Sequence, residues 1–300
     1  MALERMFKYE GLGNDFLVIE RPRGARDDAA DASLARALCD RHFGVGADGL
    51  LFVDPEQPSM HVVNADGSIP EMCGNGLRCV ALHYVRRAGD NVLARTFDVA
   101  TGAGPHTCRV ERNASDPDDA WVTVEMAVPS LEPAEVPTRH EQPMVDAPTE
   151  VGEQTLHLTA ISMGNPHAVT FDALGADPRP QQLALGPLVQ TLPLFPRGVN
   201  VGFVQTLAAD ADGLARHFQL DVLERGAGWT LACGTGACAA GVAAVLTARA
   251  PRHEALRFEL PGGPLEITVG EVGDRVRMRG PARLVFELSP SARLTGALRA

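Results

Sequence analysis

A four-residue phrase occurs twice in this chain of 300 residues, as Cys73-Gly74-Asn75-Gly76 and as Cys233-Gly234-Thr235-Gly236. The two copies stand about half the chain length apart, and a helical pattern follows each one directly. Glycine permits tight turns and close approach of the backbone, so each phrase predicts a turn that delivers its cysteine to the start of a helix. The same device used twice at this spacing predicts a chain built from two similar halves.

Other landmarks repeat in the same order. Asn64 and Glu224 each stand nine residues before their cysteine, and two further pairs of segments match, namely 13–16 with 164–167 and 44–46 with 198–200. Each match alone is weak evidence of duplication. The ordered set predicts two lobes, over residues 1–128 and 129–282, with 129–150 as their connection and 283–300 as a tail that returns to the first lobe.

Within each half, short apolar strands alternate with helical patterns. Helices are expected over 32–43, 77–88, 183–188 and 235–250, with the last ended by Pro251. Strands are expected over 7–20, 50–53, 61–64, 121–126, 157–161, 168–171, 199–205, 218–223, 257–260, 265–269 and 275–279, with a turn over 113–119. Strands outnumber helices, so the expected class is α+β, with one central helix packed in each lobe.

Composition excludes several classes of protein. The net charge of −11 argues against nucleic acid or an anionic membrane as the main partner. The N-terminus lacks the pattern of a signal peptide, and no apolar stretch reaches the about 18 residues that span a bilayer. These features predict a cytoplasmic protein with no nucleic-acid or membrane partner.

The six cysteines show neither Cys-x-x-Cys spacing nor histidines at zinc-finger spacing, so no metal site is expected. Cys39, Cys79, Cys108 and Cys238 are predicted to be structural. Lys8 is the single lysine of the chain. A pyridoxal-phosphate enzyme needs a lysine for its Schiff base, and Lys8 falls in an early strand, so this cofactor is disfavoured.

Two thiols at helix starts suggest a specific chemistry. Backbone N–H groups and the helix dipole favour the thiolate, and inversion of an amino-acid α-carbon requires removal of a proton on one face and its return on the other. Cys73 and Cys233 would act as this pair, one as thiolate and one as thiol. Gly74, Asn75, Gly234 and Thr235 would hold the reacting carboxylate at the two helix ends. The alternative is that both cysteines are small buried residues beside glycine turns.

Six segments together resemble the diaminopimelate epimerase family. They are Gly11–Phe16, Asn64–Ser68, Glu71–Gly76, Ser162–His167, Glu224–Gly228 and Ala232–Ala237, in the order of that family, with Pro261–Gly263 also matching. The resemblance implies a pair of pseudo-symmetric α+β lobes, each a mostly antiparallel sheet wrapped on a central helix, with the active site in the cleft between them. It also implies interconversion of LL- and meso-2,6-diaminopimelate without a cofactor, in the biosynthesis of lysine.

The resemblance also implies residue roles. Cys73 and Cys233 would be the acid/base pair, and His167 and Glu224 match positions that influence catalysis. The remaining positions would bind substrate: Asn14, Asn64, Gly74, Asn75, Asn165, Asn200, Glu224, Arg225, Gly234 and Thr235. A substrate with two carboxylates and two ammoniums needs a charged donor fork, an anion and several amides, so Arg225 suits the distal carboxylate and Glu224 an ammonium. The asparagines beside glycine also fit a purely turn-forming role, and His167 fits a loop histidine.

The chain departs from the family at a few positions. Gly49 stands where some members carry a glutamine that touches substrate, Leu223 where many have tyrosine, and Trp229 where a smaller polar residue is common. Members are often homodimers, and Phe286 matches an aromatic interface position. The resemblance therefore implies a homodimer.

Two other functions fit part of the pattern. Racemases of proline or hydroxyproline also use two cysteines, but usually carry histidine where Asn75 stands here, and the Glu224-Arg225 pair favours a longer, doubly charged substrate. A thiol redox or metal-binding module is the alternative outside enzymes. The separate glycine turns around the two cysteines speak against it.

Overall fold

The computed structural model describes residues 5–89 and 92–289. The chain forms two compact units: the first combines Met1–Val124 with Arg279–Ala300, and the second is Glu125–Met278. The predicted lobes meet at residues 128 and 129, and the predicted tail begins at residue 283. Residues 290–300 of that tail lie outside the described residues.

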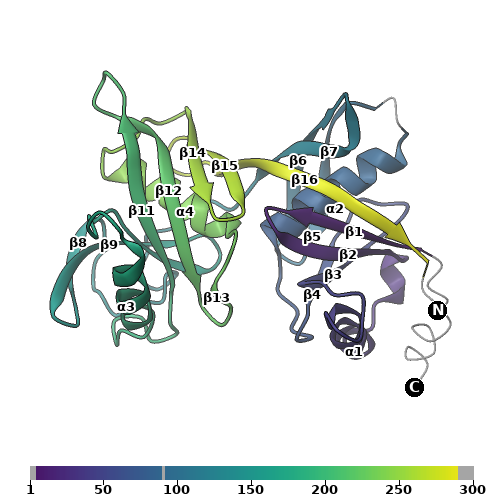
Figure 1. Ribbon diagram of the computed structural model, residues 1–300, viewed down its shortest axis with the longest axis horizontal. Coiled ribbons are helices and arrows are strands. Elements are labelled where there is room, and N and C mark those ends of the chain that lie inside the picture. Colours follow the sequence, from purple (N-terminus) through teal and green to yellow (C-terminus); the bar gives the residue numbers. More distant parts are fainter. Residues whose placement is uncertain (1–4, 90–91, 290–300) are drawn as a thin grey trace. The chain divides into compact units, whose positions relative to one another are not determined.

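The first unit is built around one sheet and two helices (Figure 1). Its strand order is β4-β3-β2-β1-β16, and β7, β6 and β5 continue the sheet beyond β16. Strands β2 and β3 are parallel, whereas β1–β2, β3–β4, β1–β16, β5–β6 and β6–β7 are antiparallel. The elements are β1 Met6–Gly11, β2 Asn14–Glu20, the short 3-10 helix η1 Arg23–Ala25, α1 Asp28–Cys39, β3 Gly49–Val53, β4 His61–Asn64, α2 Gly74–Arg87, β5 Ala94–Thr101, β6 Gly104–Asn113, β7 Asp116–Glu125 and β16 Arg277–Leu288.

The second unit repeats this plan. Its strand order is β15-β14-β12-β11-β10-β9-β8, with β13 on β12. Strands β10 and β11 are parallel, as are β12 and β14, and β8–β9, β9–β10, β11–β12 and β14–β15 are antiparallel. The elements are β8 Ala147–Val151, β9 Gln154–Ser162, β10 Pro166–Thr170, α3 Arg179–Gln190, β11 Asn200–Ala209, β12 Ala215–Glu224, β13 Gly228–Trp229, α4 Gly234–Leu246, β14 Ala255–Leu260 and β15 Gly263–Thr268.

The two units share one order of elements. In each, a strand hairpin leads through a helix into a parallel strand, then an antiparallel strand, the helix after the cysteine phrase, and a second hairpin. The first hairpin is β1–β2 in one unit and β9–β10 in the other, and the second is β5–β6 and β14–β15. The predicted α+β class is confirmed.

The helix that follows each cysteine phrase is the central one of its unit. Every residue of α2 from Gly74 to Val85 is buried, and α4 is buried on nearly all sides. Helix α4 is apolar all round, as is typical of a core helix, whereas α2 also buries the polar side chains of Asn75, Arg78 and His83. Helix α2 contacts β1, β2, β3, β5 and β6, while α4 contacts β9 to β12 and β15. Separate apolar clusters lie beside them, one including Leu17 and Leu50 and the other Leu158 and Val201.

The four predicted helices are present, but their ends differ: α2 begins three residues before the predicted 77–88, and α3 extends beyond the predicted 183–188 at both ends. Helix α1 begins at Asp28, where the Asp27 side chain accepts a hydrogen bond from the backbone N–H of Ala30. It ends at Cys39 and not at residue 43, because the Asp40 carboxylate accepts the N–H groups of His42 and Phe43 and so forms a turn. Helix α4 ends at Leu246, where Thr247 caps it, before the expected stop at Pro251.

Three other sequence expectations differ from the structure. The strand expected over 7–20 is a hairpin whose turn is Leu12-Gly13, both with positive φ. The turn expected over 113–119 is shorter, since β7 already begins at Asp116. Strand β5 was not predicted: six of its eight residues are exposed or half-buried, so it lacks the apolar alternation of a half-buried strand.

The segment expected as a connection, 129–150, contributes to the second unit. Val136 and Met144 are each 1% exposed and belong to its apolar core, and β8 begins at Ala147. Two apolar side chains thus anchor a segment rich in proline and glutamate. Within residues 5–89 and 92–289, no helix combines the length and apolar character needed to cross a bilayer.

Candidate active site

Cys73 is the N-cap of α2. Its backbone is extended, with φ −137° and ψ 114°, and its Sγ accepts the N–H of Gly76 at 3.4 Å. A side chain at Gly76 would not fit without movement, because its Cβ would lie 3.0 Å from the Leu51 side chain. The glycine phrase therefore places a half-buried thiol at the positive end of a helix.

Cys233 occupies the same position at the start of α4. Its φ is −124° and its ψ 104°, and its Sγ accepts the N–H of Gly236 at 3.3 Å. The Thr235 hydroxyl lies 3.6 Å from the same sulfur, and a Cβ at Gly236 would lie 3.1 Å from it. Each unit thus holds one cysteine in the same capping geometry.

The protonation of Cys233 differs from the expectation that a helix start favours the thiolate. Burial raises the pKa of the Cys233 thiol well above its ordinary value, and the negative charge of Glu224 raises it further. The hydrogen bonds from Thr235 and from the backbone of Gly236 act in the opposite direction but are smaller. Only 4% of this residue is exposed, so the loss of hydration outweighs the helix end and the protonated thiol is favoured.

The other cysteines lie in the core of their units. Cys39, Cys79, Cys108 and Cys238 are buried. Burial raises the pKa of Cys39 and of Cys108 to about 12, and it also raises the pKa of Cys79. These environments favour unreactive thiols.

In the first unit, two predicted binding residues and Gly49 lie at one end of neighbouring strands. Asn14 begins β2, Gly49 begins β3 and Asn64 ends β4, with Gly49 paired to Asn64. The start of α2 reaches the same end, since the Asn75 side-chain amide donates to Asn14 Oδ1 at 3.1 Å. Cys73, Gly74, Asn75 and Asn14 are therefore neighbours in the structure.

Asn64 and Gly49 have clear local constraints. Asn64 Nδ2 donates to the Ser68 hydroxyl at 2.9 Å and so holds the loop before Cys73. A Cβ at Gly49 would lie 2.8 Å from the carbonyl oxygen of Val63. Any larger residue at position 49 would have to shift the β3–β4 pairing, so glycine here is a packing requirement.

In the second unit, a hydrogen-bonded chain connects a buried histidine with the Cys233 loop. His167 Nε2 lies 3.0 Å from Asn165 Oδ1, and Asn165 Nδ2 donates to the Thr235 hydroxyl at 3.3 Å. Burial lowers the pKa of His167 to about 3, with a smaller contribution from the positive charge of Arg225. The imidazole is therefore neutral, and its Nε2–H donates to the amide oxygen.

Asn200, Glu224 and Arg225 lie at the matching end of the second sheet. Asn200 pairs with His167 across β10 and β11, and its Oδ1 accepts the backbone N–H of Arg225 at 2.8 Å. The Arg225 guanidinium donates to the carbonyl oxygen of Arg197 at 2.7 Å, and Glu224 accepts the Thr230 hydroxyl at 2.6 Å. These contacts order an exposed cation next to a half-buried anion.

The structure adds residues that sequence reasoning missed. Asp48 accepts from Asn14 Nδ2 at 2.7 Å, Ser68 holds Asn64, and Thr230 holds Glu224. The position of Asp48 between Gly46 and Gly49 was a usable signal, because a charged residue within a glycine-rich loop often has a fixed partner. Ser68 and Thr230 carried no signal apart from their closeness to predicted binding residues.

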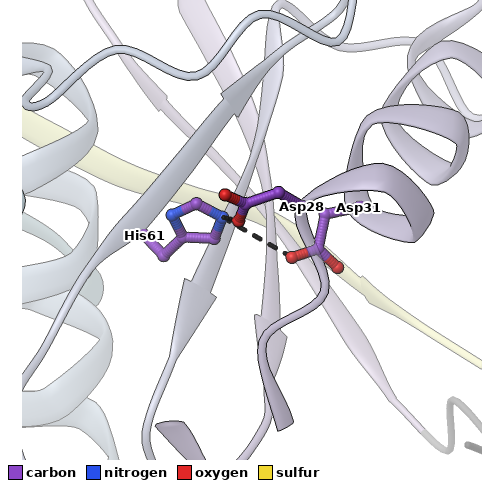
Figure 2. A group of neighbouring side chains, drawn as sticks. All are labelled: Asp28, Asp31 and His61. Carbon is purple, nitrogen blue, oxygen red and sulfur yellow. Dashed lines mark ion pairs between the residues drawn. The ribbon is translucent and has the colours of Figure 1, made fainter. Parts of the chain in front are cut away.

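In the described part of the chain, one group of side chains of the types that bind metals lies close together. It consists of Asp28, Asp31 and His61 (Figure 2). His61 Nε2 lies 3.7 Å from Asp28 and 3.5 Å from Asp31. Arg26 pairs with Asp28 at 2.6 Å, and Arg21 donates to Asp31 at 2.7 Å. Two arginines thus neutralise the two carboxylates, and burial lowers the pKa of His61, so the group has no excess negative charge to attract a cation. That the chain binds no metal stays a prediction.

The chain is similar to known epimerases over most of its length. The family described as diaminopimelate epimerase matches residues 6–131 and 159–285. The chain is 43% identical over 288 residues to the diaminopimelate epimerase of Microcystis aeruginosa, covering 93% of this chain and 96% of the relative. It is 42% identical over 294 residues to diaminopimelate epimerase 1 of a Nostoc species, covering 95% and 99%. A solved probable proline racemase from Agrobacterium radiobacter has a similar fold, with a TM-score of 0.62 at 14% identity, covering 96% and 93%.

These similarities define the chain as an enzyme of the isomerase class, an epimerase. The chain belongs to the diaminopimelate epimerase family. The resemblance inferred from six short segments of the sequence is therefore confirmed.

Proposed function

We propose that this enzyme interconverts LL- and meso-2,6-diaminopimelate, in the biosynthesis of lysine, by proton transfer between substrate and two cysteines. The observation that carries the proposal is the repeated N-cap: Cys73 and Cys233 have the same backbone geometry and the same Sγ contact to the third residue of their helices. Membership of the epimerase family supplies the substrate.

In the proposed step, the Cys73 thiolate removes the α-proton and the Cys233 thiol delivers a proton to the opposite face of the carbon. The electron pair of the broken C–H bond forms the new C–H bond, and Cys233 is left as the thiolate. The raised pKa of Cys233 supports its role as the proton donor in this direction. For the reverse reaction the two cysteines exchange roles.

The remaining site residues would hold the two ends of the substrate. The first N–H groups of a helix have no partner within the helix, so the turns at Gly74-Asn75 and Gly234-Thr235 suit the reacting carboxylate. Arg225 suits the distal carboxylate and Glu224 an ammonium. Four amides complete the proposed site: Asn14, Asn64, Asn165 and Asn200. His167, being neutral, would fix the orientation of Asn165.

The enzyme is also proposed to be a cytoplasmic homodimer that needs no cofactor. Phe286 is 41% exposed and supports an apolar contact between subunits. Lys8 supports the absence of a pyridoxal Schiff base, because its ammonium pairs with Asp15 at 2.6 Å and donates to the carbonyl oxygen of Gly46. An amine held in this way is not free to attack an aldehyde.

Turnover in deuterated water is expected to place deuterium at the α-carbon of the product. The reason is that a thiol exchanges its proton with solvent, so the proton delivered by Cys233 comes from water. Mass spectrometry of both isomers during the reaction measures the incorporation. Full activity with no deuterium in the product would exclude thiol-mediated proton transfer.

Replacing Arg225 by alanine is expected to raise the KM for diaminopimelate about 100-fold, since a carboxylate bound by a guanidinium loses a charge-assisted pair. The melting temperature should change by less than about 2 °C, because the guanidinium is exposed and donates to one carbonyl oxygen. Arg216 offers a matched control, as an arginine of the same unit that pairs with Asp210, Asp212 and Glu254. A large loss of stability with an unchanged KM would show that Arg225 stabilises the fold and does not bind the substrate.

Substrate choice separates the proposal from its rivals. A proline-type racemase would act on proline or hydroxyproline and not on diaminopimelate, and a thiol redox module would turn over neither. The probable proline racemase shares the fold of this chain at low sequence identity. A shared fold by itself does not identify the substrate. Conversion of LL- to meso-diaminopimelate by purified protein without added cofactor is the direct test.

A further inference from the structure

We propose that Asp48 is a positioning residue that sets the amide orientation of Asn14 and, through it, of Asn75 beside Cys73. This inference rests on the proposed function, because it assigns a role toward the substrate site of that reaction. It is carried by a group of four charged side chains, Lys8, Asp15, Arg41 and Asp48, which we call the charge cluster.

Asp48 dictates which end of the Asn14 amide faces it. Its Oδ2 accepts from Asn14 Nδ2 at 2.7 Å and from the backbone N–H of Asp15 at 3.1 Å, and its Oδ1 accepts from Arg41 at 2.8 Å. A carboxylate only accepts hydrogen bonds, so the NH₂ group of Asn14 must point to Asp48. The Asn14 oxygen then faces Asn75, whose Nδ2 donates to it at 3.1 Å.

The alternative orientation of Asn14 is excluded by two repulsive contacts. Rotating the amide by half a turn would place its oxygen against the Asp48 carboxylate and its NH₂ group against the NH₂ group of Asn75. Without Asp48, an amide can accept or donate at either end, and both orientations become accessible. Asp48 therefore selects one state of a two-residue amide chain that ends at Asn75, the third residue of the phrase Cys73–Gly76.

The charge cluster holds the Asp48 carboxylate in a fixed position. Arg41 Nη2 bridges Asp48 and Asp15, at 2.8 and 2.7 Å, and Lys8 pairs with Asp15 at 2.6 Å. The four side chains carry two positive and two negative charges, so each carboxylate has a cation beside it. The hydrogen bonds from Arg41 and Lys8 lower the pKa of Asp15 despite its burial. The cluster also gives a role to Lys8, the single lysine of the chain, which the catalytic scheme does not use.

The backbone of Asp48 is held as firmly as its side chain. Its N–H donates to the carbonyl oxygen of Asp15 at 2.8 Å, and its own carbonyl oxygen accepts from Ala65 at 3.0 Å. Gly49, the next residue, pairs with Phe16 and Asn64 on the neighbouring strands. The carboxylate is thus presented to Asn14 from a rigid strand end, which is what a positioning role requires.

A double-mutant cycle between Asp48 and Asn14 tests the proposal. Asp48→Asn keeps the volume of the side chain but replaces one oxygen by a donor, so it should lower kcat/KM about tenfold. In the Asn14→Ala background the same change should lower kcat/KM by less than about twofold, since residues that act through one another are not additive. Asp40→Asn is the control: this carboxylate lies in the same loop and accepts only backbone N–H groups in its described contacts, and its replacement should leave kcat/KM unchanged.

The possible results separate a positioning role from a structural one. Equal losses in both backgrounds, or wild-type kinetics in Asp48→Asn, would overturn the proposal. If Asn14→Ala turns over too slowly to measure, calorimetric affinity for diaminopimelate replaces kcat/KM in the same cycle. A wild-type enzyme that does not epimerise diaminopimelate would instead refute the proposed function, so the two failures are distinguishable.

Discussion

Replacing Cys73 or Cys233 by alanine is expected to lower the rate of epimerisation roughly 10³-fold or more. General acid–base groups typically contribute 10² to 10⁴ to a rate, and here each face of the α-carbon would depend on one sulfur. The measurement is the conversion of LL- to meso-diaminopimelate, followed together with the melting temperature of each variant. Both variants should remain folded, since removal of one sulfur from a helix N-cap costs about 1 kcal/mol.

Cys79 and Cys238 are the matched controls for this experiment. Both lie in the same two central helices, Cys79 six residues after Cys73 and Cys238 five residues after Cys233, and both are 0% exposed. Alanine at either position should reduce stability at least as much as alanine at the capping cysteines and leave the rate per folded molecule unchanged. Normal turnover in Cys73→Ala or Cys233→Ala would refute the two-base scheme.

The second large effect is expected in acid. The folded enzyme should lose about 1.4 kcal/mol of unfolding free energy per pH unit for each histidine held neutral, as the pH falls below 6.5. Burial lowers the pKa of His167 to about 3, so between about pH 3 and pH 6.5 the unfolded chain binds more protons than the folded one, and burial also lowers the pKa of His83, which acts in the same direction. The stabilisation from the neutral imidazoles is therefore complete above pH 6.5 and lost below it.

Denaturant unfolding between pH 7 and pH 4.5 measures this effect, with tryptophan fluorescence as the signal, from Trp121 in the first unit and Trp229 in the second. His167→Gln should reduce the slope of the unfolding free energy of the second unit against pH by the equivalent of about one proton. Replacing the exposed His140 by glutamine should leave the slope unchanged. If the unfolding free energy of the wild-type enzyme does not change with pH in this range, His167 accepts a proton in the folded state.

Much of the local structure could be predicted from the sequence. The two phrases at Cys73 and Cys233 begin central helices as predicted, since glycine freedom and capping are properties of a few adjacent residues. The duplicated order of landmarks predicted two similar arrangements, and the same order of strands and helices is found in both units. The family resemblance came from short segments in a fixed order, which need no knowledge of distant contacts.

The sequence was least informative where a segment gives no periodic signal. Only two of the eight residues of β5 are buried, and its pairing with β6 gives it its extended form. The end of α1 depends on the Asp40 side chain competing for two backbone N–H groups, a choice that helical periodicity does not show. The bounds of such elements depend on neighbouring strands and side chains in the folded protein. The pattern of apolar and polar residues along the chain does not show these neighbours.

The amino-acid sequence by itself determined the chemical groups of the proposed site, namely two cysteines at helix starts, five asparagines and the Glu224-Arg225 pair, because local turns and motifs specify them. Tertiary structure decided how those groups behave. It buried Cys233 beside Glu224 and so favoured its thiol, and it kept His167 neutral. It also brought Asp48 to Asn14, two residues that are 34 positions apart in the sequence. Protonation states and amide orientations depend on burial and on neighbours distant in sequence, and these exist only once the chain has folded.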